Sequence, residues 1–199
     1  MNLTEDSGRG LSIRTIEAEA FRDFARQFGT SEEIGPIATA MDKDAPLDPR
    51  VDRATLGLYG CETLCAAACL VTTSTEDGAV VCKLDSVIVD QALRRRSLAK
   101  MLVTSTFSAL ATQSAGRLDR VYAHSVHPAT VRLLGSLGFN PPPPVGAPLS
   151  VVNLDNESRE KFVAKCDEVK DGISQRFKLQ CAFCTSNDRR SRPWCQPSD

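Results

Sequence analysis

Apolar residues in the first part of the chain alternate between a strand-like and a helix-like spacing. Leu11 to Ile16 predicts a strand. The next segment repeats apolar residues every three or four positions and stops at Gly29, which predicts a helix. The apolar positions of this helix are Ala18, Phe21, Phe24, Ala25 and Phe28. A second helix is predicted from Ser31 to Met41, followed by a loop rich in Asp and Pro.

Three extended segments follow in the middle of the chain. Arg53 to Gly60 and Leu64 to Thr75 read as two strands, and the short polar link between them predicts a hairpin. The turn sequence TEDGA then leads into a third long strand from Val80 to Asp90. The pattern therefore predicts three strands that are consecutive along the chain.

The third of these strands changes the parity of its apolar positions. Val80 and Leu84 share one parity, whereas Val87 and Val89 have the other. Side chains alternate strictly along a regular strand, so one extra residue near Asp85 and Ser86 would restore the register, as a β-bulge does. A strand buried on both faces is the alternative, because parity then carries no information.

The second half of the chain continues the alternation of helices and strands. A long helix is predicted from Leu98 to Ala115, and the predicted elements after it are a strand at 120–126, a short helix at 127–139, a strand at 149–155 and a polar amphipathic helix at 156–177. Pro128 suits the first position of the short helix, and Gly138 suits its end. Residues 140–148 form a Pro-rich loop. The order predicts a mixed α/β fold.

Charge and composition narrow the classes of protein. The formal net charge is −1 over 199 residues, which argues against bulk binding of nucleic acid or of a membrane surface. The N-terminus lacks the apolar segment of a signal peptide, and no run approaches the length of a membrane span. We therefore expect a cytoplasmic protein with mostly reduced thiols. Cys61, Cys65, Cys69 and Cys82 lie in apolar surroundings and read as packing residues.

Three consecutive arginines stand between the third strand and the long helix. Arg94, Arg95 and Arg96 precede Ser97, where the helical pattern begins. Helix N-termini bind anions, because unpaired N–H groups and the helix dipole point outward there. A ligand that carries phosphate is the candidate that this arrangement favours, and a solvated arginine cluster is the alternative. A nucleotide P-loop does not fit, since no Gly-Lys-Ser/Thr is present.

The segment Arg94 to Ala99 resembles the acetyl-CoA-binding signature of the GNAT superfamily of N-acyltransferases, Arg/Gln-x-x-Gly-x-Gly/Ala. The later segment HPATVRLLGSLGF resembles the second conserved segment of that superfamily. The resemblance covers residues 11–155 and implies a mixed, mostly antiparallel central sheet flanked by helices. Residues 156–199 would add a C-terminal helix and a tail that contains cysteines.

The resemblance also implies how acetyl-CoA would bind. Backbone groups of the third strand would pair with the pantetheine arm, and N–H groups of the arginine turn would hold the pyrophosphate. The residues implied in cofactor binding are Val87, Ile88, Val89, Arg94, Arg95, Arg96, Ser97, Leu98, Ala99 and His127. Glycine is usual in the family where Ser97 stands, and asparagine where His127 stands.

The implied activity is transfer of an acetyl group to a primary amine, but the usual catalytic acid is missing. Leu134 occupies the position of the family's tyrosine. Asp85 and Glu62 are candidate bases, or simply solvated acids. His124 is a candidate acid or base, or a hydrogen-bonded structural residue. The acceptor is open between a small molecule, a peptide or protein amine and an aminoacyl group. A non-catalytic module that binds acyl-CoA or a protein is the alternative.

The C-terminal tail carries a C-x-x-C pair and a third cysteine. Cys181, Cys184 and Cys195 have a spacing that can hold zinc, with Cys166 as the favoured fourth ligand and a histidine or Asp188 as the alternatives. A flexible tail with incidental thiols, or a tail docked through Trp194, is the alternative. The basic segment DRRSRPW offers at most a weak contact to an acidic partner such as RNA. The sequence does not indicate an oligomeric state.

Overall fold

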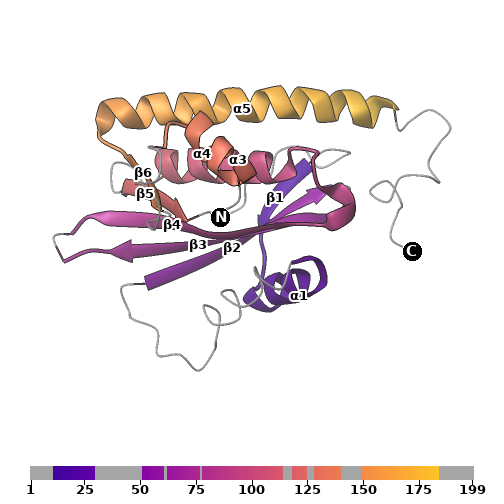
Figure 1. Cartoon of the computed structure of the whole chain (residues 1–199), viewed down its shortest axis with the longest axis horizontal. Coiled ribbons are helices and arrows are strands. Elements are labelled where there is room, and N and C mark those ends of the chain that lie inside the picture. Colours follow the sequence, from indigo (N-terminus) through magenta and orange to yellow (C-terminus); the bar gives the residue numbers. More distant parts are fainter. Residues whose placement is uncertain are drawn as a thin grey trace.

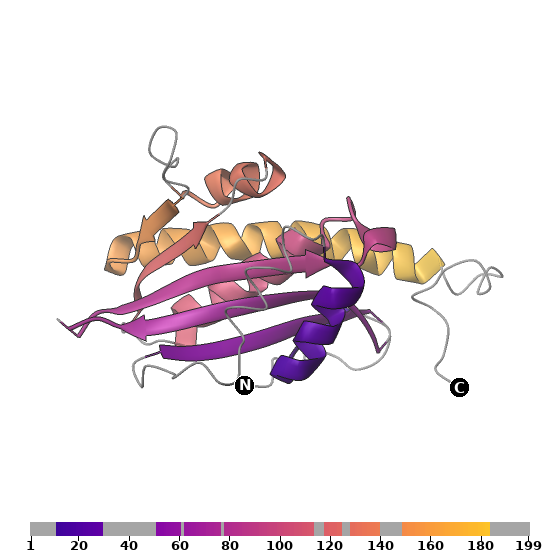
Figure 2. The same ribbon diagram turned by 60° about the horizontal axis from the view of Figure 1, so that its bottom comes forward.

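A computed structural model describes residues 11–29, 51–60, 62–76, 78–113, 118–124, 128–139 and 149–183. A twisted sheet forms the middle layer, with α1 on one face and α3, α4 and α5 on the other (Figure 1). Figure 2 shows α1 lying across the long strands near one end, with α5 behind them. The expected helix at 31–41 lies outside the described residues.

The described elements follow the predicted order along the chain. The strands are β1 (Leu11–Thr15), β2 (Val51–Gly60), β3 (Thr63–Ser74), β4 (Val80–Val89), β5 (Leu118–His124) and β6 (Leu149–Asn153). The helices are α1 (Ala18–Phe28), the short 3-10 helix η1 (Gln91–Leu93), α3 (Leu98–Gln113), α4 (Pro128–Ser136) and α5 (Asn156–Phe183). Pro128 opens α4 as predicted, and Gly138 follows its end with a φ of +89°.

The sheet has the simplest possible order, β1-β2-β3-β4-β5-β6, among the described strands. Neighbouring strands run antiparallel except for β4 and β5, which run parallel. A parallel pair needs a crossover connection, and α3 supplies it. This mixed, mostly antiparallel sheet confirms the predicted fold class.

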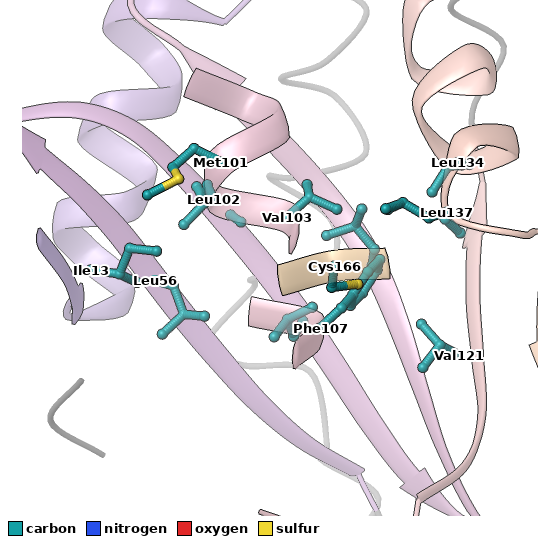
Figure 3. Packing of buried hydrophobic residues seen from close by; sticks show 14 of the residues in the cluster. Ile13, Leu56, Met101, Leu102, Val103, Phe107, Val121, Leu134, Leu137 and Cys166 are labelled. Carbon is teal, nitrogen blue, oxygen red and sulfur yellow. The ribbon is translucent and has the colours of Figure 1, made fainter. Parts of the chain in front are cut away.

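The main core fills the space between the sheet and α3, α4 and α5. Phe107 of α3 lies at its centre, with ring centroids 5.7 Å from Phe139 and 5.9 Å from Phe162 of α5. Figure 3 shows Cys166 beside Phe107, with Leu134 of α4 and Leu137, which follows α4, on the same side of the view as Val121 of β5. Three helices therefore share one core.

Helix α5 is part of this core and not an appendage to it. Phe162, Cys166 and Ile173 are all buried in the main core, and the Ser108 hydroxyl of α3 donates a hydrogen bond of 2.7 Å to Asp167. Asp155 caps the N-terminus of α5 by accepting from the Ser158 N–H at 2.8 Å. Buried side chains of α5 and of the sheet therefore pack together across the expected boundary at residue 155. In the described part of the chain, no helix is long and apolar enough to cross a membrane.

A second, smaller core lies under α1 on the opposite face. Phe21 and Phe24 of α1 pack against Ala67, Cys69 and Ile88 of the sheet. Ile88 therefore faces α1, whereas its neighbours Val87 and Val89 pack toward the main core. The C-terminal half of β4 is thus held from both sides.

Candidate active site

The parallel strands β4 and β5 separate halfway along β4. Their pairing runs from Val80 beside Leu118 to Leu84 beside Ala123. From Asp85 to Val89, β3 is the one described strand that pairs with β4, so the other edge of β4 is open among the described strands. In Figure 2, β5 starts beside β4 and then leaves its line. An open strand edge presents unpaired N–H and C=O groups that an extended ligand can pair with.

The separation begins at a β-bulge. Leu84 pairs with Leu70 and Ser86 pairs with Cys69, so Asp85 is an extra residue without a partner on β3. Bulges bend the strand and increase its twist, which helps β4 to leave β5. The parity change in the sequence predicted this bulge, and the register confirms it. The alternative of a strand uniformly buried on both faces is wrong.

The open edge has a defined hydrogen-bonding direction. The Asp90 N–H donates to the Cys65 carbonyl oxygen of β3 at 3.1 Å. Because successive residues of a strand point their backbone groups to opposite sides, Val89 and Val87 point theirs toward the open edge. These groups are the ones that the sequence predicted to pair with a pantetheine arm.

The turn between β4 and α3 is shaped to expose N–H groups. Arg95 and Ser97 have φ values of +65° and +64°, in the left-handed region that favours glycine. The first α-helical hydrogen bond of α3 runs from the Met101 N–H to the Ser97 carbonyl oxygen at 2.9 Å. The N–H groups of Leu98, Ala99 and Lys100 therefore have no acceptor within the helix. Free N–H groups at a helix N-terminus have the geometry that phosphate binding requires.

The exposed side chain of Arg94 binds two backbone carbonyl oxygens of the protein. Its Nε donates to the Val89 carbonyl oxygen at 3.2 Å, and its Nη2 donates to the Phe28 carbonyl oxygen at 2.9 Å. These bonds tie the end of α1 to the end of β4. All three arginines of the turn, Arg94, Arg95 and Arg96, are exposed.

Asp85 lies at the point where the strands separate, and it is paired. Its carboxylate accepts a hydrogen bond from the Lys83 ammonium, and only 14% of its side chain is exposed. The Asp85 charge contributes to the raised pKa of the Cys69 thiol, about 11, although burial is the larger cause. Because Cys69 packs toward α1, Asp85 and Lys83 lie on the α1 side of the sheet.

Glu62, the other candidate base, is bound elsewhere. Both of its oxygens accept hydrogen bonds from Arg14, at 2.6 and 2.8 Å. These bonds hold the pKa of the Glu62 carboxyl below its usual value. Glu62 sits in the β2–β3 hairpin with a φ of +67°, so its visible role is structural.

The remaining predicted catalytic positions lie around β5 and α4. His124 is the last residue of β5 and pairs with Leu149, which places its backbone beside the gap between β4 and β5. His127 lies outside the described residues. Leu134 is buried in the main core with 1% of its surface exposed. Leu134 therefore supplies packing where the family's tyrosine would supply an acid.

The cysteines give the zinc prediction no support. Cys166 and Cys181 both lie on the continuous helix α5, so at 1.5 Å per residue they are about 22 Å apart and cannot share one metal ion. Cys166 is instead a core residue, and burial raises the pKa of its thiol to about 12. No cluster of metal-binding side chains occurs in the described ranges, and Cys184 and Cys195 lie outside them.

Sequence reasoning missed two groups at this site. The Ser86 hydroxyl is buried beside the bulge and has no hydrogen-bond partner in the described structure. Arg53 of β2 faces the same side of the sheet as Lys83 and has a buried Nε without a partner. The alternation of β2 could have indicated the face of Arg53, but only the register of the strands shows what lies beside it.

Solved structures share this fold. The chain is similar to AtaTR bound with AcCoA, with a TM-score of 0.56 and 16% identity over 76% of this chain and 96% of that one. It is also similar to a single-site mutant of KacT, with a TM-score of 0.54 and 15% identity over 77% of this chain and 99% of that one. A third match is AtaT complexed with acetyl-methionyl-tRNAfMet, with a TM-score of 0.50 and 13% identity over 75% and 97% of the two chains.

No protein-family profile and no curated protein sequence matches the chain. At the identities of the solved structures, the similarity shows the fold alone. The chain has the fold of the GNAT acetyltransferases. The fold that the two sequence motifs implied is therefore confirmed.

Proposed function

We propose that this protein is an acetyl-CoA-dependent N-acetyltransferase that modifies a primary amine. The observation that carries the proposal is the open edge of β4, which begins at the Asp85 bulge and leads to the exposed N–H groups at the start of α3. An extended chain that ends in phosphates matches both features at once. Acetyl-CoA bound to a protein of the same fold supports this choice of substrate.

The reaction needs little covalent chemistry from the protein. The amine nitrogen attacks the thioester carbonyl carbon, the new C–N bond forms and the C–S bond breaks. The amine loses one proton, and the departing thiolate of CoA gains one. Positioning the two reactants and excluding water supply most of the rate in such a transfer.

We assign roles to the residues as follows. The backbone groups of Val87 and Val89 pair with the pantetheine arm, with Ile88 between them bonded to β3, and the N–H groups of residues 95–99 bind the pyrophosphate. Asp85, with Lys83, accepts the proton of the amine directly or through water. His124 remains a second candidate for proton transfer, and His127 a candidate cofactor contact. The buried Ser86 hydroxyl is placed to donate a hydrogen bond to the thioester or thiolate.

Leu134 favours a second candidate function. A leucine buried to 99% cannot protonate a thiolate, so the fold could serve as a binding module that keeps acyl-CoA without using it. The two candidates share the cofactor site and differ only in turnover. A protein or peptide acceptor and a small-molecule acceptor are both compatible with the enzyme.

Calorimetry with acetyl-CoA, followed by a panel of primary amines analysed by mass spectrometry, tests both candidates. We expect micromolar binding and the appearance of an acetylated amine together with free CoA. The variant Ala99→Glu should abolish acetyl-CoA binding, because its carboxylate repels the phosphates. The same substitution should not unfold α3, because acidic residues in the first turn stabilise a helix. Ala99→Gln is the neutral control of the same size.

The outcomes separate clearly. Absence of acetyl-CoA binding would contradict both functions. Binding that Ala99→Glu and Ala99→Gln weaken equally would indicate a steric effect and not a phosphate site. Binding without any acetylated amine would favour the binding module.

A further inference from the structure

A row of basic and aromatic side chains crosses the α1 face of the sheet beside the proposed site. Arg53 pairs with Val71, Val71 with Lys83, and Lys83 with Tyr122. Residues that pair directly across strands share a face. Arg120 lies on the same face, because it pairs with Val81, two residues before Lys83. We call Arg53, Lys83, Arg120 and Tyr122 the basic row.

The basic row lies beyond the part of this face that α1 covers. Helix α1 packs over Ala67, Cys69 and Ile88, toward the C-terminal end of β4. Figures 1 and 2 show α1 under that end of the sheet alone. Among the described elements, no helix packs on the row itself.

The charge of this surface is not balanced by the described residues. Arg53, Lys83 and Arg120 carry three positive charges, and Asp85 carries the negative charge that pairs with Lys83. Arg53 is half-buried, and its Nε has no hydrogen-bond partner. A buried guanidinium N–H without an acceptor lowers the stability of the folded protein. A carboxylate or phosphate would remove this cost by accepting two parallel hydrogen bonds, one from Nε and one from Nη.

Arg22 provides a second observation of the same kind. It lies on α1, on the same side of the sheet, and it also has a buried Nε without a partner. Two partly buried arginines on one side of a sheet, each with an unsatisfied donor, indicate a missing anion better than either does alone.

The basic row is also close to the place where the reaction would occur. Lys83 and Tyr122 are one residue before Leu84 and Ala123, the last pair before β4 and β5 separate. Arg53 is two strands from β4, or about 10 Å at ordinary strand spacing. An arginine side chain reaches back over most of this distance. The phosphates of acetyl-CoA would lie at the opposite, C-terminal end of β4.

We propose that the basic row recognises an anionic group on the acceptor, so that the substrate is a primary amine with a carboxylate or phosphate within about 10 Å of its nitrogen. This inference rests on the proposed acetyltransferase function. Arg53 is the specificity-determining residue, and the amine then lies beside Asp85, where it loses its proton as the C–N bond forms and the C–S bond breaks.

Matched pairs of amines test the inference with the full-length protein. γ-Aminobutyrate is compared with n-butylamine, and O-phosphoethanolamine with ethanolamine. We expect kcat/KM to favour the anionic member of at least one pair by about tenfold or more, as charge-assisted hydrogen bonds do. The pair that shows the larger preference identifies carboxylate or phosphate as the anion.

The variants locate that preference. Arg53→Gln should remove the preference, measured as the ratio of kcat/KM for the two members of each pair, and Arg53→Lys should retain part of it. Lys161→Gln makes the same charge change on α5, on the other side of the sheet, and should leave the preference intact. A preference that is absent from both wild-type pairs, or that survives Arg53→Gln, would overturn the inference.

A second experiment distinguishes the absence of acetyltransferase activity from the absence of the anion site. If acetyl-CoA binds but no amine is acetylated, calorimetric titration of the CoA-loaded protein with γ-aminobutyrate and O-phosphoethanolamine still decides the question. Binding that Arg53→Gln weakens by about tenfold keeps the anion site. Absence of binding, or binding that the substitution does not change, removes it.

Discussion

Arg94 donates its Nε hydrogen to the carbonyl oxygen of Val89, on the open edge of β4, at 3.2 Å. The same side chain holds the last carbonyl of α1, that of Phe28, at 2.9 Å. An arginine that the sequence places in a phosphate-binding turn thus holds the turn together. Its neighbour Arg95 is left to face solvent.

The two arginines should therefore respond differently to substitution. Arg94→Ala should lower the free energy of unfolding by about 1 kcal/mol, because its exposed hydrogen bonds to carbonyl oxygens are lost. Arg95→Ala should leave the free energy of unfolding unchanged and weaken acetyl-CoA binding, more strongly at low salt. Urea unfolding and calorimetry measure the two effects. Equal loss of acetyl-CoA affinity in both variants, with no change in unfolding, would assign Arg94 to the phosphates.

Ser97→Gly should stabilise the protein by about 0.5–1 kcal/mol. A serine at a φ of +64° bears a conformational strain that glycine does not, and this gain exceeds the extra entropy that glycine loses. Ser105→Gly, inside helix α3, should instead lower the free energy of unfolding by about 0.5 kcal/mol. Thermal unfolding compares the two variants. Loss of stability in both would mean that the left-handed conformation at Ser97 is not strained.

Alanine substitutions at two glycines, one inside α4 and one just after it, should change the free energy of unfolding in opposite directions. Gly135 is inside α4, and a Cβ there would meet nothing within 4 Å, so Gly135→Ala should stabilise by about 0.5–1 kcal/mol. Gly138 has space for a Cβ as well, 3.7 Å from Lys165, but its φ is +89°. Gly138→Ala should therefore destabilise by about 1–2 kcal/mol through the backbone alone. Urea unfolding of both variants checks the signs.

Buried thiols should make the protein sensitive to alkali. Burial raises the pKa of Cys166 from 9.0 to about 12, so the folded state keeps a proton that the unfolded state releases. The stability from this thiol is fully present below pH 9 and is lost as pH rises from about 9 toward 12, by up to about 1.4 kcal/mol per pH unit. Cys166→Ala should lower stability at pH 7 but flatten this alkaline loss. An unchanged slope between pH 9 and 10.5 would assign the loss to other groups.

The sequence predicted those features that depend on local pattern. The bulge at Asp85 followed from a change of parity between Leu84 and Val87, because strand alternation leaves no other way to keep one face apolar. The ends of α1 and α4 followed from Gly29 and Gly138 in the same way. The local sequence is sufficient to determine these features.

Features that depend on distant contacts were not predictable. The spacing of Phe162, Cys166 and Ile173 predicted an amphipathic helix at 156–177, but the sequence did not show that this apolar face packs against α3. Arg94 could not be distinguished from Arg95 without the position of Phe28. Arg53 and Lys83 are 30 residues apart, so their common face required the register of three strands.

The order of the sheet has a consequence for how the chain folds. Each described strand lies beside its neighbours in sequence, so β2, β3 and β4 can pair successively as the chain emerges, with short turns between them. Local contacts of this kind favour fast folding. The parallel pair β4–β5 is different, because it must wait for α3 to form and pack before β5 can return. We expect the β4–β5 pair to form late in folding and to show the fastest hydrogen exchange of the strand pairs in the sheet. The gap that would admit a ligand therefore lies beside the least protected strand pair.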